Sequence, residues 1–145
     1  MTEVVIASAC RTPIGKFQGT LSSFTAPQLG AHVAKEAIAR AGIRPEDVDE
    51  TIMGNVLGCG LGQAPARQVS RAAGIPDSTS ALTINKVCGS GLKAVMLAAQ
   101  AIKAGDLEVA IAGGFESMSN VPYYLRNHRG GVKFGDQTVQ DGLIY

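Results

Sequence analysis

The pattern of apolar and polar positions changes period several times along the first 114 residues. Short apolar, β-branched runs predict strands, and stretches in which apolar residues recur every three or four positions predict helices. The predicted strands span residues 4–8, 50–57, 81–85 and 108–112, and the predicted helices span 25–41, 64–73 and 89–104. Strands that alternate with helices indicate an α/β layered fold whose sheet is largely buried.

Several of these elements carry signals at their ends. Thr25 can cap the first helix, Gln28 stands three residues later to complete a capping box, and Gly42 ends the helix. Gly113 and Gly114 interrupt the last predicted strand. The large apolar positions of the last long helix share one face. They are Leu92, Val95, Met96, Ala99 and Ile102.

Composition and charge exclude several classes of function. Apolar residues make up 46% and charged residues 17% of the 145 residues, a balance typical of a chain that buries a core. A net charge of +1 gives no sign of a nucleic-acid partner. The sequence has no apolar stretch near the ~20 residues of a membrane helix and no pattern of a secretion signal. We therefore expect a cytoplasmic protein, or a mitochondrial one whose targeting segment has been removed, with no membrane partner.

The cysteines are the first candidates for chemistry. Cys10, Cys59 and Cys88 have spacings that match no zinc or CxxC pattern, so we expect no metal site. Cys88 follows a predicted strand and falls at the start of a predicted helix, where unpaired N–H groups and about half a positive charge favour a thiolate. Its own N–H could face an oxyanion. By this spacing alone, a nucleophile and a small buried apolar residue are equally good interpretations.

The other candidates have simpler interpretations. Cys10 is expected to be a packing residue. The loop around Cys59 lacks the third glycine of a dinucleotide-binding GxGxxG motif because Gln63 stands there. A single carboxylate after two glycines, Glu116, is expected to be a structural hydrogen-bond acceptor. His32 is expected to lie on a surface or an interface. The sequence assigns no cofactor-binding residue.

Four segments together resemble the thiolase family. They are SACRTPIG at 8–15, GQAPAR at 62–67, NKVCGSG at 85–91 and GGFESMS at 113–119. They occur in the family's order and spacing and are spread over almost the whole chain. The NKVCGSG segment is similar to that of the biosynthetic branch, the acetyl-CoA acetyltransferases, more than to that of the long-chain degradative thiolases.

This resemblance implies a reaction. Two acetyl-CoA molecules would give acetoacetyl-CoA and coenzyme A, and the reverse, through an acetyl-Cys88 intermediate. Acetyl-CoA, acetoacetyl-CoA and coenzyme A would be substrates in lipid metabolism, with no permanently bound cofactor. The resemblance also implies a homo-oligomer, a dimer or a tetramer.

The resemblance implies an architecture as well. The chain would form the αβα half of the αβαβα thiolase arrangement, with a mixed, five-stranded sheet and helices on both faces. Residues 1–119 would be the N-terminal thiolase domain, and 120–145 the start of the loop domain. The cationic cluster in the latter resembles the family's tetramerisation loop, although a solvated loop is the simpler interpretation. Its residues are Arg126, His128, Arg129 and Lys133.

Three other thiolase segments do not occur in this sequence. They are GHP, NEAF and CxGGG, which in the family supply the activating histidine, a water-positioning asparagine and a second cysteine. We therefore expect the chain to be a piece of a longer enzyme, inactive alone and exposing an apolar face. Two alternatives stay open: a catalytically inactive thiolase-like interaction module, and a 3-ketoacyl-CoA thiolase of broader chain length. A ketoacyl synthase is disfavoured by RTPIG and GGFESMS.

Overall fold

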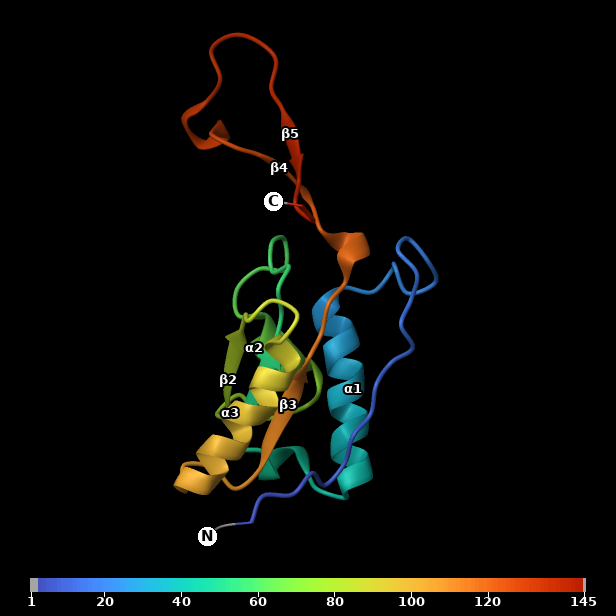
Figure 1. The fold of residues 1–145 in the computed structure, drawn as a ribbon, viewed down its shortest axis with the longest axis vertical. Helices are drawn as coiled ribbons and strands as arrows, with labels where there is room; N and C mark the ends of the chain where they lie inside the picture. Colours follow the sequence, from blue (N-terminus) through green and yellow to red (C-terminus); the bar gives the residue numbers. More distant parts are fainter. Residues whose placement is uncertain (1–2, 145) are drawn as a thin grey trace.

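A three-stranded parallel sheet forms the centre of the structure, a computed structural model that describes residues 3–144 (Figure 1). Its strands are β1 (Glu50–Gly54), β2 (Ser80–Ile84) and β3 (Ala110–Gly114), in the order β2–β1–β3. In register, Gly54 pairs with Ile84 on one side and with Gly114 on the other. All three strands therefore end at the same edge of the sheet.

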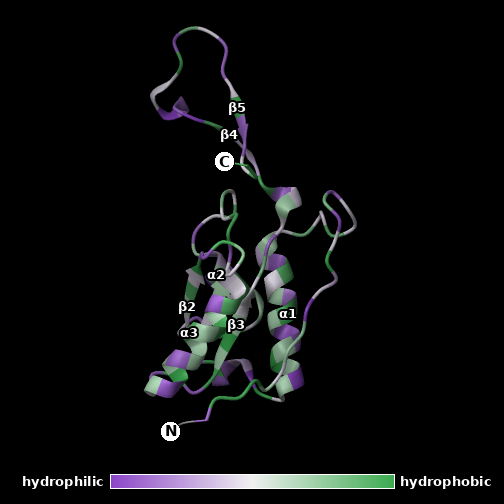
Figure 2. Cartoon of the chain, in the orientation of Figure 1, coloured by the Kyte–Doolittle hydropathy of each residue, from purple (hydrophilic) through white to green (hydrophobic). Residues whose placement is uncertain are grey.

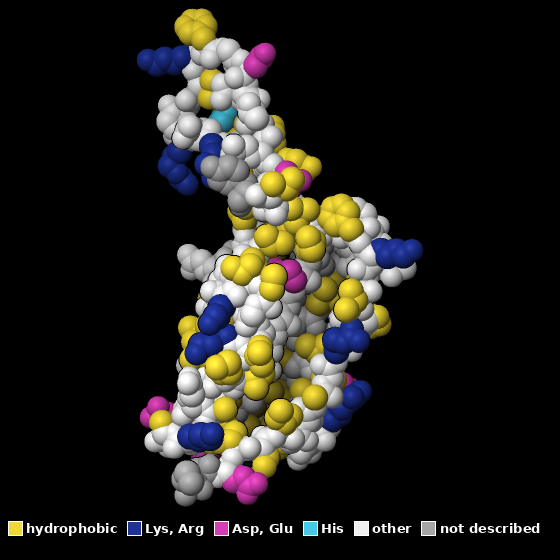
Figure 3. Space-filling view, in the orientation of Figure 1, with side chains coloured by type: hydrophobic (Ala, Val, Ile, Leu, Met, Phe, Trp, Pro, Cys, Tyr) yellow, Lys and Arg dark blue, Asp and Glu magenta, His cyan; other side chains and the backbone are white. Residues whose placement is uncertain are grey.

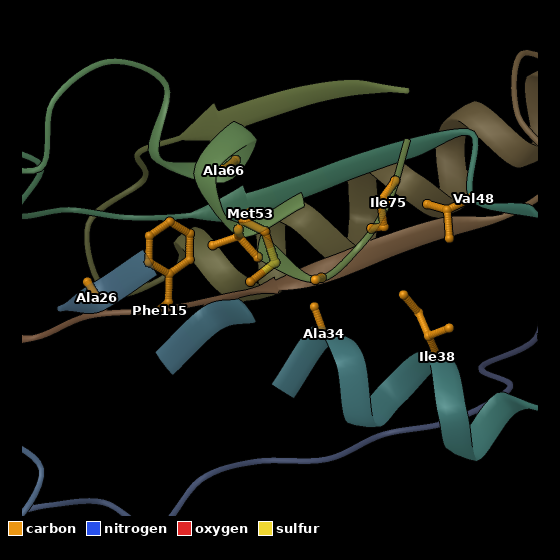
Figure 4. Close-up of a cluster of buried hydrophobic side chains, with 10 residues drawn as sticks. Ala26, Ala34, Ile38, Val48, Met53, Ala66, Ile75 and Phe115 are labelled. Atoms are coloured by element: carbon orange, nitrogen blue, oxygen red, sulfur yellow. The ribbon is translucent and has the colours of Figure 1, made fainter. Parts of the chain in front are cut away.

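Helices cover both faces of this sheet. They are α1 (Ala26–Ala41), α2 (Pro65–Ala72) and α3 (Ser90–Ala104). Because side chains alternate along a strand, Ile52 and Met53 of β1 point to opposite faces. Met53 joins the apolar cluster under α1 and α2, whereas Ile52 packs against α3. Figure 4 shows Met53 and other members of the first cluster between α1 and the sheet.

The predicted layered α/β class, with helices on both faces, is confirmed. The start of α1 is also as predicted: the Thr25 N–H donates to Gln28 Oε1 at 2.8 Å, and the Gln28 N–H donates to Thr25 Oγ1 at 3.4 Å. Gly42 ends the helix in the left-handed region with φ of 67°. No helix among residues 3–144 is long and apolar enough to cross a membrane.

The strand predicted at Val4–Ser8 is wrong. This segment runs along α1 without pairing (Figure 1), and Ile6 is 77% exposed. Side-chain bonds tie it to the helix, since the Ser8 hydroxyl donates to the Ala37 carbonyl at 2.7 Å. The run has the composition of a buried strand, but it makes no ladder with any strand that the structure describes.

The sheet also differs from the mixed, five-stranded one that we expected. Over residues 3–144 it has three strands, and all are parallel. The strand predicted at 108–112 instead spans 110–114 and continues through Gly113 and Gly114. The two glycines do not interrupt the strand. A Cβ on Gly114 would lie 3.3 Å from the Gly91 Cα at the start of α3, whereas one on Gly113 would meet only the Met53 side chain.

Several large apolar residues of α3 are exposed, although Leu97 packs partly buried against the cluster around Ile52. Ala94 and Ala98 are the buried contacts, whereas Leu92 is 69% and Met96 48% exposed. Figure 2 shows the mixed hydropathy of α3, and in Figure 3 hydrophobic side chains gather on the face where it lies. The expected exposed apolar face is therefore present in the structure.

A β-hairpin projects beyond this body (Figure 1). Its strands, β4 (Tyr123–Leu125) and β5 (Val139–Asp141), pair antiparallel. At its base the Gly142 N–H donates to the Pro122 carbonyl at 3.2 Å. Three short 3-10 helices complete the description: η1 (Pro45–Asp47), η2 (Met118–Asn120) and η3 (His128–Gly130). The two domains predicted at 1–119 and 120–145 extend to residues 1–2 and 145, which lie outside the described residues.

Candidate active site

Polar side chains meet where the three parallel strands end. Asn55 follows β1, Asn85 follows β2 and Glu116 lies two residues after β3. The Glu116 carboxylate accepts from Asn55 Nδ2 at 2.8 Å and from the N–H groups of Val56 and Leu57 at 2.9 and 3.0 Å. Glu116 is therefore a structural acceptor, as predicted. It fixes the loop after β1 to the end of β3.

Cys88 lies at this edge, in the turn between β2 and α3. Gly89 caps α3, so that Cys88 stands just before the helix. Its thiol is exposed. The alternative interpretation, a small buried apolar residue, is therefore wrong, whereas its role as nucleophile stays a prediction. An exposed thiol at the carboxyl edge of a parallel sheet occupies the usual place of ligands in α/β folds.

Side chains hold the turn around Cys88. The Val87 N–H donates to Asn85 Oδ1 at 2.9 Å. The Ser90 hydroxyl donates to the Val87 carbonyl at 2.6 Å and accepts from the Lys86 N–H at 2.8 Å. Val87 itself has φ of +47°, a left-handed conformation that costs a β-branched residue about 1–3 kcal/mol. The sequence pattern does not predict this conformation, because β-branched residues are the ones that avoid it.

Glycines let the start of α3 approach the sheet. A Cβ on Gly54 would lie 2.6 Å from the Ser90 Cβ, and one on Gly114 would lie 3.3 Å from the Gly91 Cα. Distances this short leave no room for a side chain at Gly54. Gly54, Gly91 and Gly114 therefore form a close backbone contact, hereafter the glycine seat. This contact sets how near the start of α3, and with it the Cys88 turn, lies to the ends of β1 and β3.

The remaining candidates lie in other elements. The half-buried Cys10 thiol donates to the Val33 carbonyl at 3.1 Å, which agrees with its predicted packing role. His32 is exposed on α1, as predicted. The Cys59 loop packs against the hairpin base, since a Cβ on Gly60 would lie 3.2 Å from Pro122 Cγ. A hydrogen bond with Cys59 raises the pKa of Tyr124.

Arg67 of the GQAPAR segment and the residue that follows it hold neighbouring loops by hydrogen bonds. Arg67 at the start of α2 donates to the carbonyls of Asp77 and Thr79 in the loop before β2. The neighbouring Gln68 donates to the carbonyls of Leu61 and Gln63, at 2.6 and 3.0 Å. Both side chains fix loops rather than face Cys88. Among residues 3–144, His, Cys, Asp and Glu form no group of three or more that could hold a metal ion.

Comparison with known proteins agrees with this arrangement. The family described as thiolase, N-terminal domain, matches residues 4–145. This chain belongs to the thiolase family. A solved thiolase of Ascaris suum, in complex with coenzyme A, superimposes with a TM-score of 0.91 and 49% identity over 95% of this chain and 36% of its own.

Similar sequences agree with this thiolase assignment. The cytosolic acetyl-CoA acetyltransferase of Gibberella zeae is 57% identical over 97% of this chain and 36% of its own length. The acetyl-CoA acetyltransferase of Cupriavidus necator is 57% identical over 99% of this chain and 37% of its own. A mitochondrial acetyl-CoA acetyltransferase of Xenopus laevis is 57% identical, with 99% and 35% covered. This thiolase chain thus spans about a third of the length of the relatives it matches.

Proposed function

We propose that this chain is the N-terminal part of an acetyl-CoA acetyltransferase in which Cys88 carries the acetyl group. The observation that supports this most is the position of the exposed Cys88 thiol, at the carboxyl edge of the sheet in a chain of the thiolase family. The relatives at 57% identity bear the name of this activity. The solved Ascaris suum thiolase holds coenzyme A.

The reaction proposed in the direction of cleavage has two steps. The Cys88 thiolate attacks the keto carbon of acetoacetyl-CoA and forms a sulfur–carbon bond. The bond between that carbon and the neighbouring CH₂ then breaks, and the leaving enolate takes up a proton to become acetyl-CoA. In the second step the sulfur of coenzyme A attacks the acetyl-Cys88 thioester and leaves with the acetyl group, which frees the Cys88 thiolate. Both thioesters have similar energies, so the steps run in either direction.

The Cys88 turn would serve these steps in two ways. Gly89 next to it has no side chain, which leaves space for a substrate thioester at the sulfur. The strand-to-helix turn exposes the thiol in the same manner as the nucleophile elbow of hydrolases. Proton transfer needs a base. The only histidines among residues 3–144 are His32 on α1 and His128 in η3, and neither lies in this turn. By the family resemblance, later segments of a longer protein would supply it.

The hairpin supports a proposal about domains and assembly. Residues 1–119 would be the catalytic N-terminal domain, and 120–145 the start of a loop domain. The projecting arm carries a cationic cluster, of which Arg129 and Lys133 are exposed. We propose that it contacts other copies in a homo-oligomer. Lipid metabolism in the cytoplasm is the proposed setting, and a mitochondrial one is equally compatible with the names of the relatives.

One observation favours a second candidate function. The apolar face of α3 at Leu92 and Met96 is uncovered in this chain, as expected of an interaction module without activity of its own. A 3-ketoacyl-CoA thiolase of broader chain length would use the same nucleophile. It would differ only in how long an acyl group it accepts.

The decisive experiment is acetylation of the thiol. The chain, and the longer protein that carries it, would be incubated with acetyl-CoA and analysed by intact mass and peptide mapping. We expect one acetyl group on Cys88 in the longer protein, which Cys88→Ala abolishes and Cys59→Ala leaves in place. Cys59 is the matched control because its thiol is also exposed. Equal labelling of both cysteines, or of neither, would exclude Cys88 as the acyl carrier.

A further inference from the structure

The turn before α3 forces Val87 into a conformation that its side chain does not explain. Its φ is +47°, and its side chain is 64% exposed, so apolar burial does not hold it there. Backbones of this kind persist only where neighbouring groups over-determine them, and they gather at functional sites. The residue that follows is Cys88, the proposed nucleophile. What holds Val87 therefore also directs Cys88.

Two side chains hold the backbone of Val87 from both ends. Its N–H donates to Asn85 Oδ1 at 2.9 Å, and its carbonyl accepts the Ser90 hydroxyl at 2.6 Å. The same hydroxyl accepts from the Lys86 N–H at 2.8 Å. One oxygen thus bridges the peptide group before Lys86 and the peptide group after Val87, on the N-terminal side of Cys88.

The two side chains differ in their surroundings. Ser90 is only 4% exposed, whereas Asn85 is exposed. Water therefore cannot easily replace the bonds of the Ser90 hydroxyl, and a shielded hydrogen bond is electrostatically stronger than one in water. The position of Ser90 is itself fixed, because its Cβ lies against the backbone of Gly54. Ser90 thus links the Cys88 turn to the end of β1.

We propose that Ser90 is a positioning residue for the acyl transfer. Its hydroxyl keeps Val87 in the left-handed conformation and thereby sets the direction in which the Cys88 thiol leaves the turn. Asn85 assists from the exposed side. This inference rests on the proposed function of Cys88, because rotation at Val87 carries Cys88 with it and a misplaced nucleophile loses near-attack geometry.

The test is a double-mutant cycle in the full-length enzyme. Ser90→Ala is expected to lower kcat about tenfold to a hundredfold with KM for acetyl-CoA nearly unchanged. The hydrogen bonds from Asn85 and Ser90 act as a clamp on the Val87 backbone. Val87→Gly removes the need for this clamp, because glycine adopts a positive φ freely. In the Val87→Gly background, Ser90→Ala is therefore expected to cost only a small part of its original factor. A residue that only supports the fold would cost the same factor in both backgrounds.

A second pair keeps the test valid if Ser90→Ala does not fold. Asn85 is exposed, so Asn85→Ala is expected to fold. Its loss of kcat is expected to be smaller than that of Ser90→Ala, and Val87→Gly is expected to suppress it as well. The rate of Cys88 alkylation by iodoacetamide is measured in the same variants and needs no coenzyme A. Losses that are independent of Val87→Gly, or an unchanged kcat in Ser90→Ala, would overturn the proposal. Failure of acetylation at Cys88 would instead refute the proposed function, while the alkylation rates still report on the clamp.

Discussion

Gly54 and Ser90 approach so closely that a Cβ added to Gly54 would lie 2.6 Å from the Ser90 Cβ. Gly54 ends β1 and Ser90 begins α3, so the contact joins the central strand to the helix that follows Cys88. Real Cβ atoms do not approach so closely, and either strand or helix must shift to accept one. The contact therefore predicts a large effect from a single methyl group.

The substitution Gly54→Ala is expected to destabilise the protein by about 1–3 kcal/mol, as overpacking does elsewhere. It should also slow acetylation of Cys88, because the start of α3 moves. The free energy of unfolding in urea and the rate of acetyl-Cys88 formation are the measurements. Gly113→Ala is the matched control on the same sheet, since its Cβ would meet only the flexible Met53 side chain at 3.5 Å. If both substitutions had equal effects, the close contact would not be the cause.

One carboxylate, that of Glu116 after β3, holds the loop that follows β1. Glu116→Gln replaces one of the two acceptor oxygens by an NH₂ group, so either the Val56 N–H, which donates to Oε2, or the Leu57 N–H, which donates to Oε1, loses its acceptor. We expect a loss of about 1–3 kcal/mol, the range for a buried donor left without its partner. Faster hydrogen exchange at whichever of Val56 and Leu57 loses its acceptor should accompany it. Glu108→Gln is the control at an exposed carboxylate, and an equal loss there would contradict the assigned role of Glu116.

The hairpin base should respond to alkaline pH. A hydrogen bond with the Cys59 thiol is the largest cause that raises the pKa of Tyr124, and burial adds to it. The protonated phenol is thus favoured in the folded chain. Its stabilisation is complete below the ordinary tyrosine pKa of about 10 and is lost as the pH rises through the raised value.

Absorbance titration of Tyr124 would measure this shift. With Tyr123 and Tyr145 replaced by Phe, the remaining tyrosine is expected to titrate above the ordinary value. Cys59→Ala should bring its pKa back toward that value, whereas Cys10→Ala should leave it unchanged, because Cys10 bonds to α1 instead. A titration curve that ignores Cys59 would show that the thiol is not the cause.

The outer face of α3 should control association of the isolated chain. Leu92→Glu with Met96→Lys is expected to reduce self-association and dye binding while changing the free energy of unfolding by no more than about 0.5 kcal/mol. Both positions are exposed on one helix face. Light scattering against concentration is the measurement. Gln100→Lys adds charge at an exposed polar position of the same helix, and it should have little effect.

The sequence predicted best those elements that depend on residues close together along the chain. The Thr25 and Gln28 capping box depends on neighbours in sequence and is present. The strands predicted at 50–57 and 81–85 are found at 50–54 and 80–84, the first of them shorter than predicted. The strand predicted at 4–8 needed a partner strand, which composition does not indicate. Its apolar residues instead run along α1, exposed.

Which face of α3 packs against the sheet could not be predicted from the sequence, for a different reason. The hydrophobic pattern points to Leu92 and Met96, but the start of α3 lies so close to Gly54 and Gly114 that small residues make the fully buried contacts, with Leu97 partly buried beside them. Ala94 and Ala98 therefore make the contact. At the candidate site, the four motifs point to Cys88, whose role as nucleophile stays a prediction, whereas the clamp on Val87 depends on two side-chain bonds that the sequence pattern does not specify.

The glycine seat also bears on how this protein can change. Gly54 and Gly114 come from separate strands, yet a Cβ on either would press on the backbone of Gly91 at the start of α3. In a mutational scan their effects should not add: once one is enlarged and α3 has moved outward, a second enlargement costs less. Gly54 and Gly114 would therefore be replaced together during evolution rather than one at a time.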